Sequence, residues 1–262
     1  MTSTLRTETQ GHVATVTLNR PDVRNAFNDE TIAEMSATFT RLGAEAGVRA
    51  IVLAAEGKAF CAGADLNWMR RMADYTRDEN LKDAAQLAEM LRIMDRCPKP
   101  IVARVQGDVY AGGMGLVSVC DVAVSVESAH YCLSEVKLGL MPATISPYVI
   151  RAIGPRAAHR YFLTGERFSA DEALRIGLVH QVVTLELLDA AVGSIVNALV
   201  HASPNAVREG KQLLHDVAGR TIDRALIAHT VEGIADIRAS AEGKEGVQSF
   251  LQKRKPAWLD GK

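Results

Sequence analysis

Two short segments of small residues and one glutamate carry the residue types in this 262-residue chain that could do chemistry. Residues 61–65 (CAGAD) and 111–115 (AGGMG) each lie between an expected strand and an expected helix. In such a turn, small residues let a ligand oxygen approach the main chain, and the first N–H groups of a helix favour negative charge there. Together the two turns predict an oxyanion hole, whereas either one alone is better explained by a tight turn or close packing.

Glu135 is the third such feature, because it follows an apolar segment and precedes a loop that reaches Pro142. A partly buried carboxylate has a raised pKa, as general acid–base chemistry near neutral pH requires. Composition alone favours a different reading, in which this glutamate is solvated and pairs with Lys137 or a nearby arginine. The residue types by themselves therefore leave its role open.

The hydrophobic pattern indicates the scaffold that must position these segments, an α/β core followed by an α-rich region. Strand patterns occur at 12–19, 49–54, 101–106 and 121–126, and helical patterns at 29–46 and 77–97. Beyond Pro142 most patterns are helical, at 151–163, 171–176, 185–200, 204–217, 221–239 and 244–253. No repeat of fixed period is present, so a solenoid is not expected.

Composition excludes several classes of function. Lys plus Arg number 30 against 31 for Asp plus Glu, so no net field attracts nucleic acid or an anionic membrane. No apolar stretch has the length of a membrane span, and residues 1–11 lack the apolar core of a signal peptide. The 4 cysteines are scattered, which predicts neither disulfides nor a metal site. We therefore expect a cytoplasmic protein that binds neither nucleic acid, membrane nor metal.

Five segments, in this order and spacing, resemble the enoyl-CoA hydratase/isomerase (crotonase) superfamily over nearly the whole chain. They are residues 19–26 (NRPDVRNA), 58–66 (KAFCAGADL), 109–116 (VYAGGMGL), 120–121 (CD) and the segment around Glu135. The resemblance implies an α/β spiral of β-β-α units over residues 1–195 and a helical trimerisation region over 196–262. It also implies a homo-trimer or hexamer that binds an acyl-CoA thioester and needs no metal, flavin or nicotinamide, because the thioester accepts charge through its enolate.

The same resemblance implies roles for individual residues. The N–H groups of Ala64 and Gly112 bind the thioester oxygen, and Glu135 is the acid–base. A larger set resembles the stretches that contact CoA: Arg24, Ala26, Ala62, Ala64, Asp65 and Leu66. Lys253, from an adjacent subunit, and Lys58 are weaker candidates for contact with the CoA phosphates. Trp68, Met69 and Pro142 are expected in the acyl pocket, although aromatic and methionine residues at helical spacing, such as Trp68 and Met69, more often belong to a core.

The sequence departs from the family pattern at two places. Hydratases with two catalytic glutamates carry the first at the position of Gly115, so only Glu135, 14 residues beyond Asp121, matches (135 − 121). Many relatives have a glycine-rich segment where this chain has residues 142–147 (PATISP), which predicts a bulkier wall near the reacting carbons.

One glutamate is compatible with more than one reaction. Residues 63–72 and 132–147 resemble bacterial methylglutaconyl-CoA and isohexenylglutaconyl-CoA hydratases, so hydration of a 2-enoyl-CoA of the 3-methylglutaconyl type is the expected reaction. The alternatives are a 3,2-enoyl-CoA isomerase and a non-catalytic acyl-CoA-binding protein. Such a substrate carries a distal carboxylate, which suggests that Arg70 or Arg71 lies beside the acyl pocket. The alternative is that both arginines lie on a solvated helix face. Tyr110 and Asp108 are expected to be structural.

Overall fold

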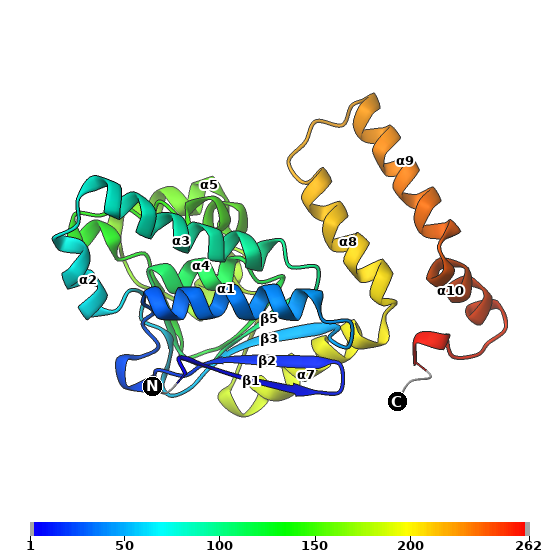
Figure 1. Cartoon of the computed structure of the whole chain (residues 1–262), viewed down its shortest axis with the longest axis horizontal. Coiled ribbons are helices and arrows are strands. Elements are labelled where there is room, and N and C mark those ends of the chain that lie inside the picture. Colours follow the sequence, from blue (N-terminus) through cyan, green and yellow to red (C-terminus); the bar gives the residue numbers. More distant parts are fainter. Residues whose placement is uncertain (1–2, 260–262) are drawn as a thin grey trace.

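The computed structural model describes residues 3–259, which form two sheets with helices around them (Figure 1). The large sheet has the order β1-β2-β3-β5-β7-β10, parallel throughout except for the antiparallel pair β1–β2. Its strands are β1 (Leu5–Gln10), β2 (Val13–Leu18), β3 (Ala50–Ala55), β5 (Ile101–Val105), β7 (Val122–Val126) and β10 (Gln181–Val183). The central strands β3, β5 and β7 are apolar runs, as expected of parallel strands covered on both faces.

The small sheet has the order β4-β6-β8-β9 and holds shorter strands. These are β4 (Ala59–Cys61), β6 (Asp108–Tyr110), β8 (His130–Cys132) and the antiparallel β9 (Phe168–Ser169). Along the chain, a strand of the large sheet is followed by a strand of the small sheet and then by a helix, as in β5-β6-α4 and β7-β8-α5. The predicted spiral of β-β-α units is therefore confirmed.

In the part of the chain that the structure describes, seven α-helices surround the sheets. They are α1 (Asp29–Ala44), α2 (Leu66–Ala73), α3 (Arg77–Asp95), α4 (Gly112–Ser118), α5 (Ser146–Thr164), α6 (Ala170–Arg175) and α7 (Leu185–His201). In Figure 1, α1 and α3 lie side by side above the large sheet, and they are in contact. The helix α7 packs against β3, β5, β7 and β10 through apolar side chains spaced four residues apart from Leu188 to Val200. Both faces of the sheet are thus covered.

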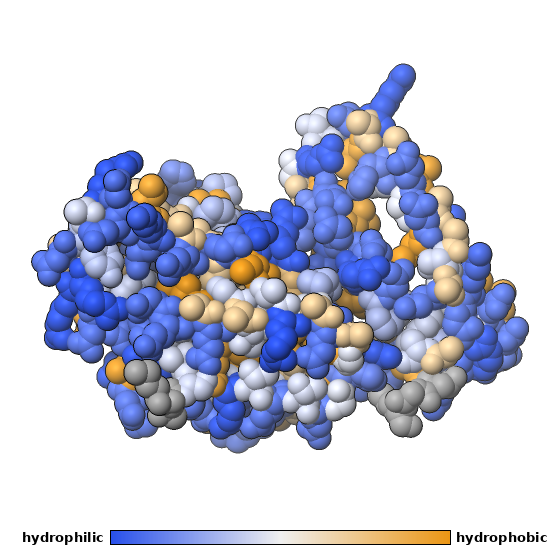
Figure 2. Space-filling model, in the orientation of Figure 1, coloured by the Kyte–Doolittle hydropathy of each residue, from blue (hydrophilic) through white to orange (hydrophobic). Residues whose placement is uncertain are grey.

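The last helices, α8 (Pro204–Val217), α9 (Arg224–Ala239) and α10 (Ala241–Leu251), extend away from the sheets (Figure 1). The boundary predicted between residues 195 and 196 falls inside α7, whose Val196 and Val200 are buried. We propose instead that the helical region begins at Pro204, because α7 still belongs to the core. Figure 2 shows hydrophobic residues gathered between the projecting helices α8 and α9.

Within residues 3–259, no single helix has the length and apolarity needed to cross a membrane. The helices α7 and α8, with a bend of 107° between them, together satisfy the same criteria of length and composition.

Candidate functional site

Three adjacent parallel strands of the small sheet carry the three chemically interesting segments to one edge. The strand β4 ends at Cys61 before the first turn, β6 ends at Tyr110 before the second, and β8 ends at Cys132 shortly before Glu135. Because β4, β6 and β8 are parallel neighbours, their carboxyl ends lie together, which is where α/β sheets commonly bind ligands. A hydrogen bond of 2.8 Å from the Ala111 N–H to the Cys132 carbonyl joins the second turn to the Glu135 segment.

The two turns are in direct contact. Gly63 has φ +91°, and a Cβ placed there would lie 2.9 Å from the Ala111 Cβ and 3.3 Å from the Tyr110 carbonyl oxygen. A side chain at residue 63 would therefore strain the backbone and push the turns apart. The glycine is required by this approach of two chain segments.

In the described chain, each turn includes a backbone N–H without a protein acceptor, at Ala64 in the first turn and at Gly112 in the second. Phe27 and Ala64 form a parallel β-bridge, but its hydrogen bonds involve the residues on either side of Ala64. The Phe27 N–H donates to the Gly63 carbonyl at 2.9 Å, and the Asp65 N–H donates to the Phe27 carbonyl at 3.0 Å. Gly112 is the first residue of α4, where N–H groups have no intrahelical acceptor. Within residues 3–259, neither the Ala64 nor the Gly112 N–H donates to a protein atom. Two such donors on touching turns suit an oxyanion.

Ala111 holds the second turn in a conformation that the sequence did not predict. Its φ of 47° and ψ of −121° are unusual for a residue with a Cβ, at a cost of about 1–3 kcal/mol. The conformation is maintained because its N–H is bonded to Cys132 and its Cβ packs on Gly63. This orients the peptide that contains the Gly112 N–H.

Glu135 begins a short 3-10 helix, Glu135–Leu138, and is half-buried. Its Oε2 is buried without a hydrogen-bond partner, and no ion pair to Lys137 or an arginine occurs in the described chain. Burial raises the pKa of Glu135, and the hydrogen bond from its own backbone N–H only partly opposes this. A carboxylate with these properties can take up and return a proton.

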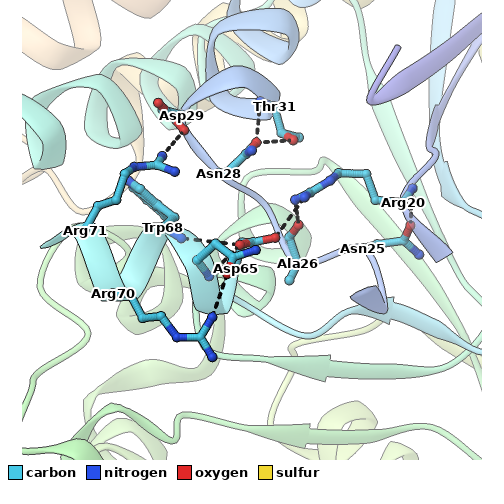
Figure 3. A network of polar contacts seen from close by, with 11 residues as sticks. Arg20, Asn25, Ala26, Asn28, Asp29, Thr31, Asp65, Trp68, Arg70 and Arg71 are labelled. Carbon is cyan, nitrogen blue, oxygen red and sulfur yellow. Dashed lines mark hydrogen bonds and ion pairs between the residues drawn. The ribbon is translucent and has the colours of Figure 1, made fainter. Parts of the chain in front are cut away.

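Asp65 anchors the first turn (Figure 3). It caps α2 by accepting from the N–H groups of Asn67 at 2.8 Å and Trp68 at 3.3 Å, and Arg20 donates to it at 2.8 Å. Burial would raise the pKa of Asp65, but the hydrogen bonds from Arg20 and α2 outweigh it and hold the pKa below its usual range. The carboxylate of Asp65 is therefore occupied by partners within the protein.

Asn25 and Arg20 organise the loop before α1, and sequence reasoning assigned neither a role. Asn25 is buried with φ 55°, accepts from the Arg20 N–H, and donates to the carbonyls of Glu56 at 2.7 Å and Ala59 at 2.9 Å. Asparagine tolerates this left-handed conformation, which is the available sequence signal. The loop brings Arg24 beside the first turn, because the Ala62 N–H donates to the Arg24 carbonyl at 3.0 Å.

The other residues predicted to contact CoA lie at several separate places in the fold. Ala26 is buried beside this loop, and Leu66 at the start of α2 is 69% exposed. Lys58 is exposed at the end of the β3–β4 connection. Lys253 follows α10, on the arm far from α2 in Figure 1. A single chain therefore does not bring Lys253 to the two turns.

The residues predicted to line the acyl pocket lie on α2 and after Glu135. Trp68 is 3% exposed and its indole donates to Asp83 at 3.0 Å, so most of its surface belongs to the core. Met69 is half-buried and Pro142 is buried.

The two arginines of α2 leave the helix in opposite directions in Figure 3. Arg71 pairs with Asp29 at 2.6 Å, while Arg70 donates to Asn67 at 2.6 Å. The charge of Arg71 is therefore already balanced, and both side chains are exposed.

Tyr110 and Asp108 take part in a surface network beside the second turn. Asp108 accepts from the His130 N–H at 2.9 Å and pairs with Arg167 at 3.4 Å, and the Arg167 guanidinium lies 5.8 Å from the Tyr110 ring centre. Within residues 3–259, no cluster of three His, Cys, Asp or Glu side chains is placed to hold a metal.

Comparison with known proteins identifies the arrangement. Residues 8–261 match the Enoyl-CoA hydratase/isomerase family. The short-chain-enoyl-CoA hydratase of Clostridium acetobutylicum is 32% identical over 95% of this chain and 94% of its own. The structure of an enoyl-CoA hydratase from Shewanella pealeana is 44% identical with a TM-score of 0.95, covering 97% of this chain and 96% of that one. Pseudomonas aeruginosa AtuE is 35% identical with a TM-score of 0.93, covering 97% and 99%. The chain belongs to the enoyl-CoA hydratase/isomerase (crotonase) family.

Proposed function

We propose that this protein is an enoyl-CoA hydratase, which adds water to a 2-enoyl-CoA thioester with Glu135 as its single acid–base residue. The observation that carries the proposal is the unpartnered Oε2 of Glu135 at the same sheet edge as the unpaired Ala64 and Gly112 N–H groups. The names of relatives such as the Clostridium hydratase support hydration.

In the proposed reaction, Glu135 accepts a proton from water as the water oxygen forms a bond to C3. The C2–C3 π electrons move toward the thioester, and negative charge develops on its oxygen between the N–H groups of Ala64 and Gly112. Glu135 then gives the same proton to C2, so that one water is added and the carboxylate is restored. Loss of one such N–H donor is expected to cost about 3–4 kcal/mol of transition-state stabilisation.

We propose a substrate of the 3-methylglutaconyl type, because residues 63–72 and 132–147 resemble hydratases of such thioesters. Its distal carboxylate requires a counter-charge, and Arg70 is the better candidate on α2 since Arg71 pairs with Asp29. Arg70→Glu should lower the preference for dicarboxyl over monocarboxyl substrates. An unchanged preference would remove Arg70 from the pocket.

We also propose a homo-trimer, or a hexamer of two trimers. The support is the projection of α8–α10 from the core with large apolar side chains exposed, including Leu214, Ile227, Val231, Phe250 and Leu251. In such an assembly, Lys253 of one protomer could reach CoA bound to another. Sedimentation of the purified protein tests the assembly.

The single carboxylate is also compatible with a second reaction, isomerisation of a 3-enoyl-CoA. There Glu135 would remove a proton from C2 and return it to C4, while the two N–H groups hold the dienolate. A non-catalytic acyl-CoA-binding protein is the alternative from another class.

Mass spectrometry distinguishes these functions when 3-methylglutaconyl-CoA, crotonyl-CoA and a 3-enoyl-CoA are each incubated with enzyme in deuterated water. Gain of one water supports the hydratase, whereas a shifted double bond with deuterium but no added water supports the isomerase. Glu135→Gln should lower turnover about 10²–10⁴-fold with thioester binding retained. The exposed Glu127→Gln is the matched control. Equal turnover in wild type and Glu135→Gln would refute the site, and binding without any turnover would support the non-catalytic alternative.

A further inference from the structure

A cavity of about 430 Å³ lies between the core and α8, apart from the candidate site. It is lined by the C-terminal ends of α3 and α4, by α5 and by α8. The helix α4 begins at Gly112, the proposed oxyanion donor, and ends in the cavity at Ser118, about 9 Å further along its axis. Neither Glu135 nor either turn lines the cavity. It is therefore separate from the site of the proposed reaction.

The α8 wall of this cavity is fixed on the core by buried polar contacts. Lys211 is 8% exposed and donates to Asp121 at 2.7 Å and to the Lys99 carbonyl at 3.2 Å. One turn further along α8, the His215 ring N–H donates to the Asp95 carbonyl at 3.1 Å. The cavity is thus part of the packed fold and does not depend on the position of a mobile surface side chain.

Ser118 presents an unsatisfied hydroxyl to the cavity. The residue is 8% exposed, and its Oγ is buried without a hydrogen-bond partner anywhere in residues 3–259. A buried hydroxyl without a partner is unfavourable, and such groups are rare in folded proteins. A ligand oxygen in the cavity would provide the missing partner.

The charged side chains around the cavity leave one positive charge in excess. The lining includes three cations and two carboxylates, namely Arg96, Arg151, Lys211, Asp95 and Asp121. Lys211 pairs with Asp121, and Arg151 pairs with Asp95. The Arg96 Nε lies 3.6 Å from Asp95, too far for a hydrogen bond, and its guanidinium donates to no acceptor in the described chain. A guanidinium with five N–H donors is therefore available to an anion.

The same cavity has an apolar side. Val119 and Leu178 line it and are 3% and 2% exposed, while Leu214 of α8 lines it and is 67% exposed. The volume also far exceeds that of one water molecule, about 30 Å³. A ligand that fits this lining combines an anionic group with an apolar body.

We propose that the cavity is a second binding site, which takes an organic carboxylate with an apolar chain. The carboxylate accepts from the Arg96 guanidinium, which matches its two oxygens in geometry, and from the Ser118 hydroxyl. The chain lies against Leu178 and Leu214. A carboxylate carries the single negative charge that the excess cation balances, whereas a phosphate group carries close to two at neutral pH.

Titration calorimetry and thermal melts of the whole protein with hexanoate test this site. Hexanoate should bind and raise the Tm as its concentration increases. Hexanamide, which has the same chain without the charge, and inorganic phosphate, which lacks the chain, should each bind at least about tenfold more weakly.

Two variants assign the binding to the cavity. Arg96→Gln and Ser118→Ala should each weaken hexanoate binding about tenfold, the loss expected for a hydrogen bond to a charged group. Ser118→Ala should not lower the Tm of the free protein, because the hydroxyl has no partner to lose. The matched control is Arg92→Gln, since Arg92 is an exposed arginine of α3 that pairs with Glu89 at 2.7 Å outside the cavity. It should leave hexanoate binding unchanged.

Three results would overturn the proposal. Equal binding of hexanamide would show an apolar surface without an anion site, and unchanged hexanoate affinity in both variants would exclude the cavity. Displacement of hexanoate by hexanoyl-CoA, a saturated thioester that cannot be hydrated, would place the ligand in the active site instead. Because binding is measured without turnover, failure of the proposed hydration would leave this inference standing, and the reverse also holds.

Discussion

Removal of the Asp65 carboxylate is expected to destabilise the fold and disturb the first turn together. The residue is 4% exposed, caps α2 and receives the Arg20 guanidinium at 2.8 Å. Because it directly follows Ala64, it also fixes the orientation of the proposed oxyanion donor. Asp65→Ala deletes the cap and the ion pair in one step.

The two losses can be estimated separately. Loss of an N-cap costs about 1 kcal/mol. Breaking a fully buried ion pair costs about 3–5 kcal/mol, but the Arg20 side chain is 23% exposed, so we expect about 1–3 kcal/mol here. Together the free energy of unfolding should fall by roughly 2–4 kcal/mol. For a chain of 262 residues the unfolding entropy is about 0.55 kcal/mol per kelvin, which gives a Tm lower by ~4–7 °C.

Thermal melts of wild type, Asp65→Ala and Asp65→Asn at neutral pH test this estimate. Asp65→Asn keeps an oxygen that can cap α2 but loses the charge, so its Tm should fall between the other two. The folded-state pKa of Asp65 is depressed, so its stabilisation is present above the unfolded pKa, about 3.9, and is lost as the pH falls through the folded value. The difference between wild type and Asp65→Asn should therefore shrink below about pH 4.

The hydration assay on the same variants reports the effect on the turn. A displaced Ala64 N–H should lower kcat as well as the Tm, with Asp65→Ala more affected than Asp65→Asn. A Tm within about 1 °C of wild type for Asp65→Ala, where a 2 kcal/mol loss would lower it by about 4 °C, would refute the claim that this ion pair and cap hold the turn.

Three further predictions follow from the same geometry. Gly63→Ala places a Cβ 2.9 Å from the Ala111 Cβ at a φ of +91°, so unfolding free energy should fall by about 1–3 kcal/mol and hydration should be lost; wild-type kinetics would contradict the required contact of the turns. Burial raises the folded pKa of Glu135, so its contribution to stability is present below the unfolded pKa and lost as pH rises through the folded value. Glu135→Gln should accordingly raise the Tm at neutral pH, and the difference from wild type should vanish in acid. Thermal melts across this pH range test the prediction. A lower Tm of Glu135→Gln at neutral pH would mean that the carboxylate is stabilised by a partner within the protein. Burial raises the pKa of Cys61 to about 12, so peptide mapping after thiol labelling should find it unmodified until the protein unfolds, and rapid native labelling would contradict this.

Local patterns predicted the elements that are long or fully buried. The strands β3 and β5 and the helix α1 have apolar residues at spacings that a window of sequence reveals. The edge strand β1 has one buried residue, Leu5, followed by exposed polar ones, so no hydrophobic alternation marks it. The strands of the small sheet have three residues or fewer, which is too short for a period. Their pairing depends on the rest of the fold.

The sequence by itself determined which residue types are available at the site. It predicted two turns that admit a ligand oxygen, one carboxylate at position 135, and the absence of a second at position 115. Only the tertiary structure decided which of these meet. The order β4-β6-β8 places the turns and Glu135 at one edge, the loop at Asn25 presents Arg20 to Asp65, and α5 lays Ile145 over Gly115. These contacts join segments more than 20 residues apart. They form because burial and backbone pairing over the whole chain select one arrangement of the sheets, which no local propensity encodes.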